Sequence, residues 1–365
     1  MTDRHAKSFT TPKSRRSILK GLGAAAIGIS LVGKKSSAWA DEEKKLNFYN
    51  WDTYIGETTL EDFKKASGID VNMSLFATND ELFAKLRAGN PGYDVIVPGS
   101  EFVERMIQAD MLEPLDHAKI PNIKNVAPEF IKDAPYDPGR KYSLPYTWLA
   151  IGIGYRKSKV KEIPDSWKWL FDSDAYKGRI AVMSDASELF RNCFKYLGQS
   201  INSTSPELIK QVEVMLTKQK PSIKSFHEDN GQDLLLSSEV DVVMEYNGDI
   251  AQVMTEDDDI DFVVPKEGAM RQSDTLAIPK GAPHPENATK FINFIFDPKV
   301  GAEISKTIKY PSPNAAATAL MPDSYKDNPV IFPPAATMAK CEYPRYLGPE
   351  FTRLLDEAMT RLRAS

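Results

Sequence analysis

The chain has 365 residues, of which 42% are hydrophobic and 27% are charged, and its formal net charge is −5. This length suggests two domains and is enough to bury a core without disulfide bridges. The ordinary apolar content excludes wholesale disorder, because disordered chains are poor in apolar residues.

The first forty residues have the pattern of a twin-arginine signal peptide. Residues 14–20 contain the arginine pair, an apolar run follows over residues 21–33, and the small residues Ala38 and Ala40 form a cleavage site. The apolar run is too short to span a bilayer, and no later stretch reaches the roughly 18 apolar residues that a membrane helix needs. We therefore expect the twin-arginine export machinery to deliver the chain to the periplasm, with cleavage after Ala40.

Removal of residues 1–40 makes the chain more acidic. This segment holds eight Lys or Arg residues and one Asp, which leaves 38 basic and 50 acidic residues and a net charge near −12. An acidic surface argues against nucleic acid as a partner and favours cationic partners.

The first part of the remaining chain alternates between strand and helix patterns. Strands are predicted at residues 46–49, 69–75 and 94–99, and helices at residues 58–66, 82–86 and 100–111, the last with Ser100 as its N-cap. A capping box at residues 78–81 begins the second helix. This alternation predicts a doubly wound, mainly parallel α/β sheet.

The second part continues the alternation without a long linker or an internal repeat. An apolar run that ends at Tyr155 predicts a strand that crosses between domains. Further strands are predicted at residues 179–183, 241–246, 261–265 and 274–279, and helices at residues 165–169, 184–197, 205–217, 287–296 and 349–363. A loop at residues 247–249 is expected after the strand 241–246. Two α/β lobes joined by continuous strands fit this pattern.

Cys193 and Cys341 are the only cysteines in the sequence. Export to an oxidising compartment permits a disulfide between them. Cys193 falls on the predicted helix 184–197, however, which favours a buried free thiol.

Signatures of enzymes and cofactor sites are missing from the sequence. It contains no G-x-S-x-G elbow, no G-x-x-x-x-G-K-[ST] phosphate loop and no H-E-x-x-H motif. No His, Cys and Asp residues have the spacing of metal ligands. We therefore expect no cofactor, no metal ion and no catalysis.

Trp51, Asp52 and Tyr54 stand where the first predicted strand passes into a loop. Open α/β sheets bind their ligands outside the carboxyl ends of the strands. Aromatic faces beside a carboxylate suit an organic cation, because the ring quadrupole attracts the cation and the anion neutralises it. The alternative interpretation is that Trp51 and Tyr54 only cover a hydrophobic core.

Carboxylates recur at the ends of predicted strands. Asp52, Asp185, Asp249 and Asp274 all have this position, and Glu188 can point at the same spot as Asp185 because the two are three residues apart on a helix. Taken singly, Asp185 is also explained as a residue at a helix N-terminus and Asp274 as a turn residue. An enzyme that uses paired carboxylates, such as a glycosidase, is a further interpretation.

Six motifs carry a resemblance to a known family. They are Tyr49-Asn50-Trp51-x-x-Tyr54, Tyr93-Asp94-Val95-Ile96-Val97-Pro98, Ser143-x-Pro145-Tyr146-x-Trp148, Asp185-Ala186-x-Glu188, Pro265-Lys266-Glu267-Gly268 and Tyr310-Pro311-x-Pro313-Asn314. In this order and near this spacing they resemble the periplasmic spermidine/putrescine-binding proteins of ABC importers. The resemblance extends from residue 46 to the last predicted helix.

The resemblance implies an α/β periplasmic binding protein fold, with two doubly wound lobes of discontinuous domains around a ligand cleft. The first lobe would comprise residues 45–151 plus 273–318, and the second residues 152–272 plus 319–365, with hinges near residues 151–155 and 270–273. The implied partners are a polyamine or another organic cation and an ABC permease in the inner membrane.

The resemblance also implies a role for individual residues. Trp51 and Tyr54 match aromatics that sandwich the methylene chain of the ligand, while Asp185 and Glu188 match carboxylates that take an amine. Asp274 matches the carboxylate that holds an amine near the middle of the site.

Three further positions complete the implied site. Tyr246 and Tyr310 match aromatic walls, although Tyr246 stands where the family usually has Trp. Asp249 matches an acidic position of the putrescine-type members.

Departures from the family pattern leave the ligand's chain length open. Gln272 replaces an aromatic wall, Glu101 stands where spermidine binders carry Tyr, and Gly99 replaces a common Ser. Gln272 and Glu101 favour one alternative, a binder of another cationic metabolite such as an opine or a guanidinium compound. Two more alternatives do not depend on these departures: an exported hydrolase that uses Asp185 and Glu188, and a sensory protein that reports polyamine to a receptor.

Overall fold

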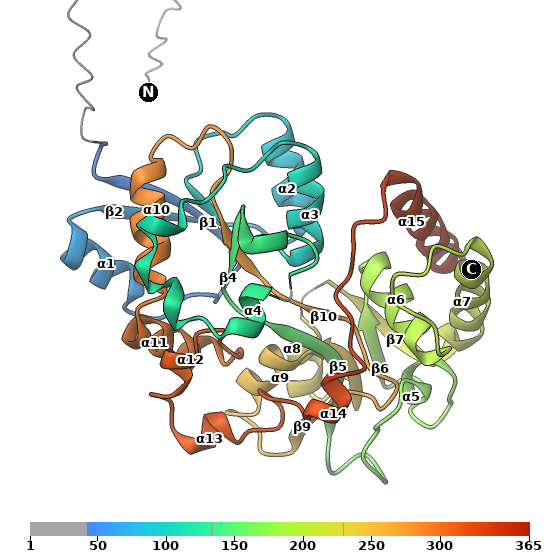
Figure 1. The fold of residues 1–365 in the computed structure, drawn as a ribbon. Helices are drawn as coiled ribbons and strands as arrows, with labels where there is room; N and C mark the ends of the chain where they lie inside the picture. The colour runs from blue at the N-terminus through green and yellow to red at the C-terminus, as the bar shows by residue number, and fades with distance from the viewer. Residues whose placement is uncertain (1–41, 133, 229) are drawn as a thin grey trace, which may run out of the picture. The chain divides into compact units, whose positions relative to one another are not determined.

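Two β-sheets organise the computed structural model (Figure 1), which describes residues 42–132, 134–228 and 230–365. The predicted signal peptide and its cleavage site lie outside the described residues. The first sheet has the order β2-β1-β3-β11-β4. Its strands are β1 (Lys45–Asn50), β2 (Asp70–Leu75), β3 (Val95–Ile96), β4 (Ser143–Pro145) and β11 (Thr275–Ala277).

The second sheet has the order β10-β5-β8-β6-β7, and β9 also pairs with β5. Its strands are β5 (Leu149–Arg156), β6 (Ile180–Met183), β7 (Ile223–His227), β8 (Val242–Tyr246), β9 (Ile260–Val263) and β10 (Arg271–Gln272).

Helices cover both sheets. The α-helices of the described residues are α1 (Thr59–Ser67), α2 (Asn79–Arg87), α3 (Ser100–Gln108), α4 (Pro128–Lys132), α5 (Lys168–Phe171), α6 (Ala186–Tyr196), α7 (Pro206–Gln219), α8 (Gly231–Leu236), α9 (Asn247–Val253), α10 (Pro285–Ile295), α11 (Pro298–Ile308), α12 (Ala315–Thr318), α13 (Asp323–Lys326), α14 (Ala335–Met338) and α15 (Pro349–Ala364). Short 3₁₀ helices span His117–Lys119, Pro121–Asn125, Pro138–Arg140 and Lys220–Ser222.

The first sheet is covered on both faces because β1 is apolar on both faces. Leu46 and Phe48 pack in one cluster with Phe291 of α10, and Tyr49 packs in another with Val103 of α3. Successive side chains of a strand point to opposite faces, so this sheet is covered on both faces as predicted. The prediction of a mainly parallel sheet was wrong, because the sheet is mixed. β1 pairs in parallel with β2 and β3, whereas β11 is antiparallel to β3 and β4.

The second sheet is mixed. β6 is parallel to β7 and β8, but β5 is antiparallel to β8, β9 and β10. Residues 149–155 of β5 are all buried, as expected for a central strand covered on both faces. Helices α6, α7 and α15 pack together beside this sheet, and α8 and α9 pack against β5 and β8.

The chain passes directly from a strand of one sheet to a strand of the other at two places. Residues 146–148 join β4 to β5, and Ser273 and Asp274 join β10 to β11. The two segments are tied together, because the Tyr146 amide donates to the Asp274 carbonyl (2.7 Å) and the Ser273 hydroxyl to the Thr147 carbonyl (2.8 Å). The division into two lobes at residues 151 and 273 stays a prediction.

Helix α9 corrects the loop predicted at residues 247–249. Asn247 begins the helix, and its side chain accepts a hydrogen bond from the Ala150 amide (3.1 Å) and donates to the Val330 carbonyl (3.1 Å). These long-range bonds fix the start of the helix and satisfy a buried amide. Asp249 therefore lies in the first helical turn.

Other predictions differ from the structure in detail. β3 has only two residues, and Gly99 rather than Ser100 is the N-cap of α3. The predicted helix 165–169 is replaced by α5. Helix α11 was not predicted, although Asp297 caps it before a proline at its first position, which is a recognisable start signal. Cys193 and Cys341 are buried free thiols, as predicted for Cys193.

We expect Gly152→Ala to lower the free energy of unfolding by about 1–3 kcal/mol, the usual cost of overpacking a core. A Cβ at Gly152 would lie 2.6 Å from the Val263 carbonyl oxygen on the paired strand β9, and would also overlap the Phe262 ring. Urea denaturation of the two proteins measures the difference. An unchanged transition midpoint would contradict the close approach of β5 and β9.

Candidate ligand-binding site

A cavity of about 480 Å³ is lined by side chains from elements of both sheets. Its volume is in the range of sites that take small molecules. All eleven residues singled out in the sequence line it, and their roles in binding stay a prediction. They are Trp51, Asp52, Tyr54, Glu101, Asp185, Glu188, Tyr246, Asp249, Gln272, Asp274 and Tyr310.

Trp51 and Tyr54 pack on core residues and also line the cavity, and their role in binding a cation stays a prediction. Tyr54 is 6% exposed and stacks edge to face on Tyr310 with a centroid separation of 5.1 Å. The Trp51 ring packs against Phe76, and its Nε1 donates to the Val97 carbonyl (2.9 Å). Both therefore cover core residues, and both also line the cavity.

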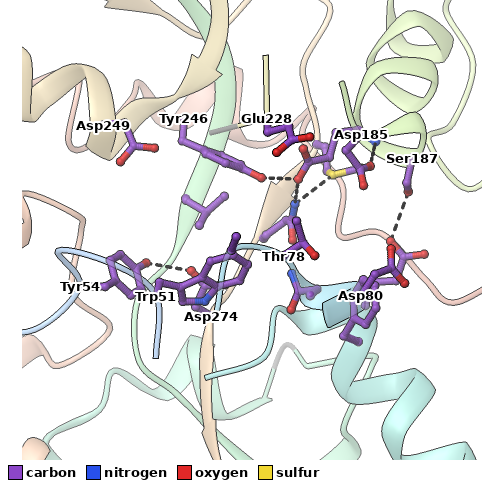
Figure 2. A pocket seen from close by; sticks show the side chains of 18 of the residues that line it. Trp51, Tyr54, Thr78, Asp80, Asp185, Ser187, Glu228, Tyr246, Asp249 and Asp274 are labelled. Carbon is purple, nitrogen blue, oxygen red and sulfur yellow. Dashed lines mark hydrogen bonds between the residues drawn. The ribbon is translucent and has the colours of Figure 1, made fainter. Parts of the chain in front are cut away.

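Asp274 is held by the hydroxyl of Tyr54. Tyr54 Oη donates to Asp274 Oδ2 (2.8 Å; Figure 2). The same hydroxyl lies 2.5 Å from Thr147 Oγ1. Burial, together with the nearby Asp274 carboxylate, raises the pKa of Tyr54 well above its ordinary value. The phenol therefore stays protonated and orients the carboxylate. Thr147 was missed from the sequence, where it falls at an unassigned position of a motif.

Glu188 is held by residues from two strands of the second sheet. Its Oε1 accepts hydrogen bonds from the hydroxyl of Tyr246, at the end of β8, and from Nε2 of Gln272 on β10 (3.1 Å). Gln272 departs from the family pattern by replacing an aromatic residue. Its amide positions the carboxylate of Glu188 while it lines the cavity.

Asp185 is the N-cap of α6, where its Oδ1 accepts a hydrogen bond from the Glu188 amide (2.9 Å). The helix-terminus interpretation of this residue is therefore right, and the residue also lines the cavity. Desolvation in the cavity and the neighbouring carboxylates Asp80 and Asp356 raise the pKa of Asp185. Burial and the other carboxylates therefore disfavour ionisation of Asp185 at this end of the cavity.

Glu101 pairs with a cation of the protein. Its carboxylate lies 2.8 Å from Nη2 of Arg191, which is fully buried, and 3.3 Å from Ser187 Oγ. Both partners lie on α6, whereas Glu101 lies on α3. Sequence reasoning missed Arg191, because a charged residue on an otherwise apolar helix face has no local signal for its partner.

Two further acidic residues of the cavity, Asp249 and Asp52, lie in a helix and in an exposed turn, respectively. Asp249 lies in the first turn of α9, where the helix dipole favours a negative charge. Asp52 is exposed in the turn after β1 and accepts a hydrogen bond from the Thr53 amide (2.9 Å), Thr53 having φ of 48°. Gly248, before Asp249, was missed from the sequence: a Cβ there would overlap the Tyr310 ring.

Neither a metal site nor a membrane helix was found in the part of the chain that the structure describes. Within residues 42–132, 134–228 and 230–365, no three His, Cys, Asp or Glu side chains form a group that could hold a metal ion. No helix of these residues combines the length and the apolar character needed to cross a membrane.

Comparison with known proteins identifies the class of the chain. Residues 58–333 match the family described as bacterial extracellular solute-binding protein, and the chain belongs to this family. The fold agrees: a solved structure titled as a putative spermidine/putrescine ABC transporter from Listeria monocytogenes matches with a TM-score of 0.83 and 29% identity, over 88% of this chain and 99% of that one. The predicted α/β fold of periplasmic binding proteins is thereby confirmed.

Curated relatives resemble the chain along nearly its whole length. The putrescine-binding periplasmic protein of Pseudomonas aeruginosa (strain UCBPP-PA14) is 33% identical, over 94% of this chain and 98% of the relative. The spermidine/putrescine-binding periplasmic protein of Escherichia coli (strain K12) is 34% identical, over 95% of this chain and 97% of the relative. The resemblance inferred from the six motifs is therefore confirmed.

The stability of the protein should depend on pH through Glu101. Burial raises the pKa of this carboxyl from 4.5 to about 7, although Arg191 opposes the change. A carboxyl that holds its proton more strongly in the folded chain costs folding free energy as pH rises from about 4.5 through 7. Between pH 4.5 and 8, the free energy of unfolding of the wild-type chain should fall by roughly 3 kcal/mol relative to Glu101→Gln.

Urea denaturation at both pH values measures this difference. Glu61→Gln on α1 controls for the loss of one carboxylate, since Glu61 is exposed and lies outside the cavity. A wild-type advantage over Glu101→Gln that grows with pH would contradict the expected sign.

Proposed function

We propose that this chain is the periplasmic substrate-binding component of an ABC importer and that it captures a polyamine of the putrescine or spermidine class. The observation that carries the proposal is a cavity with carboxylates and aromatic rings on both of its sides. Asp274 and Tyr54 line it from elements of the first sheet, and Glu188 and Tyr246 from elements of the second. The relatives that are named putrescine- or spermidine/putrescine-binding periplasmic proteins support this substrate class.

A flexible chain with an ammonium group at each end suits this lining. The two carboxylates take ammonium groups, and the faces of Trp51, Tyr54 and Tyr310 take the methylene chain between them. Each ammonium–carboxylate contact contributes about 1.5–3 kcal/mol, and a desolvated cation–π contact about 2 kcal/mol. After the cost of association, three or four such contacts give roughly −8 kcal/mol, which corresponds to micromolar affinity.

Ligand binding would couple to transport through closure of two lobes, formed by residues 45–151 plus 273–318 and by residues 152–272 plus 319–365. A polyamine that contacts both lobes stabilises the closed state by its differential contacts. A permease in the inner membrane would recognise the closed surface. The protein has no catalytic role in this proposal.

The proposed route to the periplasm is twin-arginine export followed by cleavage after Ala40. The arginine pair and the small residues at the cleavage site support it. This route carries folded chains, so the ligand site would form before export.

Native mass spectrometry of the mature protein, as purified and without added ligand, should show an additional small mass that matches a diamine or a triamine. Calorimetric titration with putrescine, cadaverine, spermidine and spermine then gives the affinities. A protein that binds none of the four amines but responds to an opine or to a guanidinium compound would contradict the proposal.

Asp274→Asn and Trp51→Ala should weaken polyamine binding most, by about 10- to 100-fold each. Asp274→Asn removes a contact of about 1.5–3 kcal/mol to a desolvated ammonium group, and Trp51→Ala removes the ring face on which the methylene chain packs. Calorimetric titration measures the affinities. Asp323→Asn on α13 is the control, since Asp323 is exposed and its carboxylate lies outside the cavity. Unchanged affinity in both cavity variants would place the ligand elsewhere.

A further inference from the structure

Arg105 on α3 is bound by the protein as a ligand cation would be. Its guanidinium carbon lies 3.9 Å from the ring centroid of Phe83, 5.3 Å from that of Phe102 and 5.6 Å from that of Tyr346. These distances are within the range of cation–π attraction. Nη1 also donates to Asp80 Oδ1 (3.1 Å), and only 21% of the side chain is exposed.

This internal cation lies at one end of the candidate cavity. Arg105, Phe102, Asp80 and Tyr346 line the same cavity as Asp274. Figure 2 shows Asp80 on the same side of the view as Asp185 and Ser187, whereas Asp249 and Tyr54 lie on the opposite side. Arg105, paired with Asp80, therefore marks the end of the cavity that is distant from Asp249.

Two further carboxyl groups, those of Asp185 and Asp356, lie at the same end of the cavity as Arg105. Burial raises the pKa of both Asp185 and Asp356, and the negative charge of Asp80 raises each of them further. Asp356 on α15 also lines the cavity. Arg105 in turn lowers the pKa of Asp356. The aromatic faces and the carboxylates at this end would suit an additional ammonium group, but the guanidinium of Arg105 already occupies them.

We propose that Arg105 determines the length of polyamine that the cavity accepts. Its guanidinium takes the contacts with Asp80, Phe102 and Tyr346 that a further ammonium group would need, and it repels such a group by like charge. The ligand is then a short diamine held between the carboxylates of Asp274 and Glu188. A triamine or tetramine binds less tightly because its added cation meets Arg105. This inference rests on the proposed function.

Calorimetric titration of the wild-type protein and Arg105→Gln with putrescine, spermidine and spermine tests the inference. The wild-type protein should bind putrescine more tightly than spermine. In Arg105→Gln the ratio of the spermine to the putrescine association constant should rise at least about tenfold, since one ion contact of about 1.4 kcal/mol corresponds to a factor of ten. Arg179→Gln, which removes a cation outside the cavity, should leave the ratio unchanged.

Two more variants separate charge from space. Arg105→Lys keeps the charge and should keep the wild-type ratio, whereas adding Asp80→Asn to Arg105→Gln should abolish the gain if the carboxylate of Asp80 takes the new ammonium group. If the higher spermine-to-putrescine ratio persists in the double variant, Arg105→Gln acted only by enlarging the cavity, and the role of Asp80 is overturned.

The outcomes also separate this inference from the proposed function. If the wild-type protein binds none of these amines, both fail. If it binds them but already prefers spermine, the inference alone fails, whatever the variants do. An unchanged ratio in folded Arg105→Gln, checked by circular dichroism, likewise overturns the inference and leaves the proposed function standing.

Discussion

Asp274 is the residue at which the two sheets and the candidate cavity meet. Its backbone carbonyl accepts hydrogen bonds from the amides of Tyr146 and Thr147, which belong to the other segment that joins the sheets. Its carboxylate accepts the hydroxyl of Tyr54, which follows β1. Because the connecting backbone itself carries this carboxylate, the position of the charge is set by regular structure rather than by a separate loop.

The acidic residues of the cavity differ in the partners that hold them. Glu101 pairs with Arg191, and Asp80 pairs with Arg105. A carboxylate that already has a protein cation beside it offers little net charge to a ligand. The hydrogen bonds described above for Asp274 and Glu188 come from hydroxyl and amide groups, which fix the orientation of each carboxylate in the cavity.

The contact between α3 and elements packed with the second sheet is made of charged groups. Glu101 reaches Arg191 on α6, and Glu104 pairs with Arg345 (2.7 Å), which precedes α15. Charged and polar contacts of this kind are typical of surfaces that separate and rejoin, because their groups can return to water. Apolar contact between the two sheets is made by Tyr246, which packs against a core cluster of each sheet.

Sequence patterns were sufficient for most of the strands and for the candidate residues at their ends, whereas β4, β7 and β10 were not predicted as separate strands. β1, β2 and β8 are apolar runs between turn residues. Trp51, Tyr54 and Tyr246 could be chosen as cavity residues because they lie at or just after strand ends. The loop predicted at Asn247 was wrong, because the bonds of its side chain to Ala150 and Val330 outweigh the local preference of Asn and Gly for turns.

By itself, the sequence determined most of the longer strands and helices, and which residues carry aromatic rings and carboxylates at strand ends. These properties follow from periodicity and capping, which depend on residues close together in the chain. Only the tertiary structure decided that Arg191 pairs with Glu101, 90 residues away, and that Arg105 lies among Phe83, Phe102 and Tyr346. Such partners have no local signal, because they are chosen by how the sheets and helices pack.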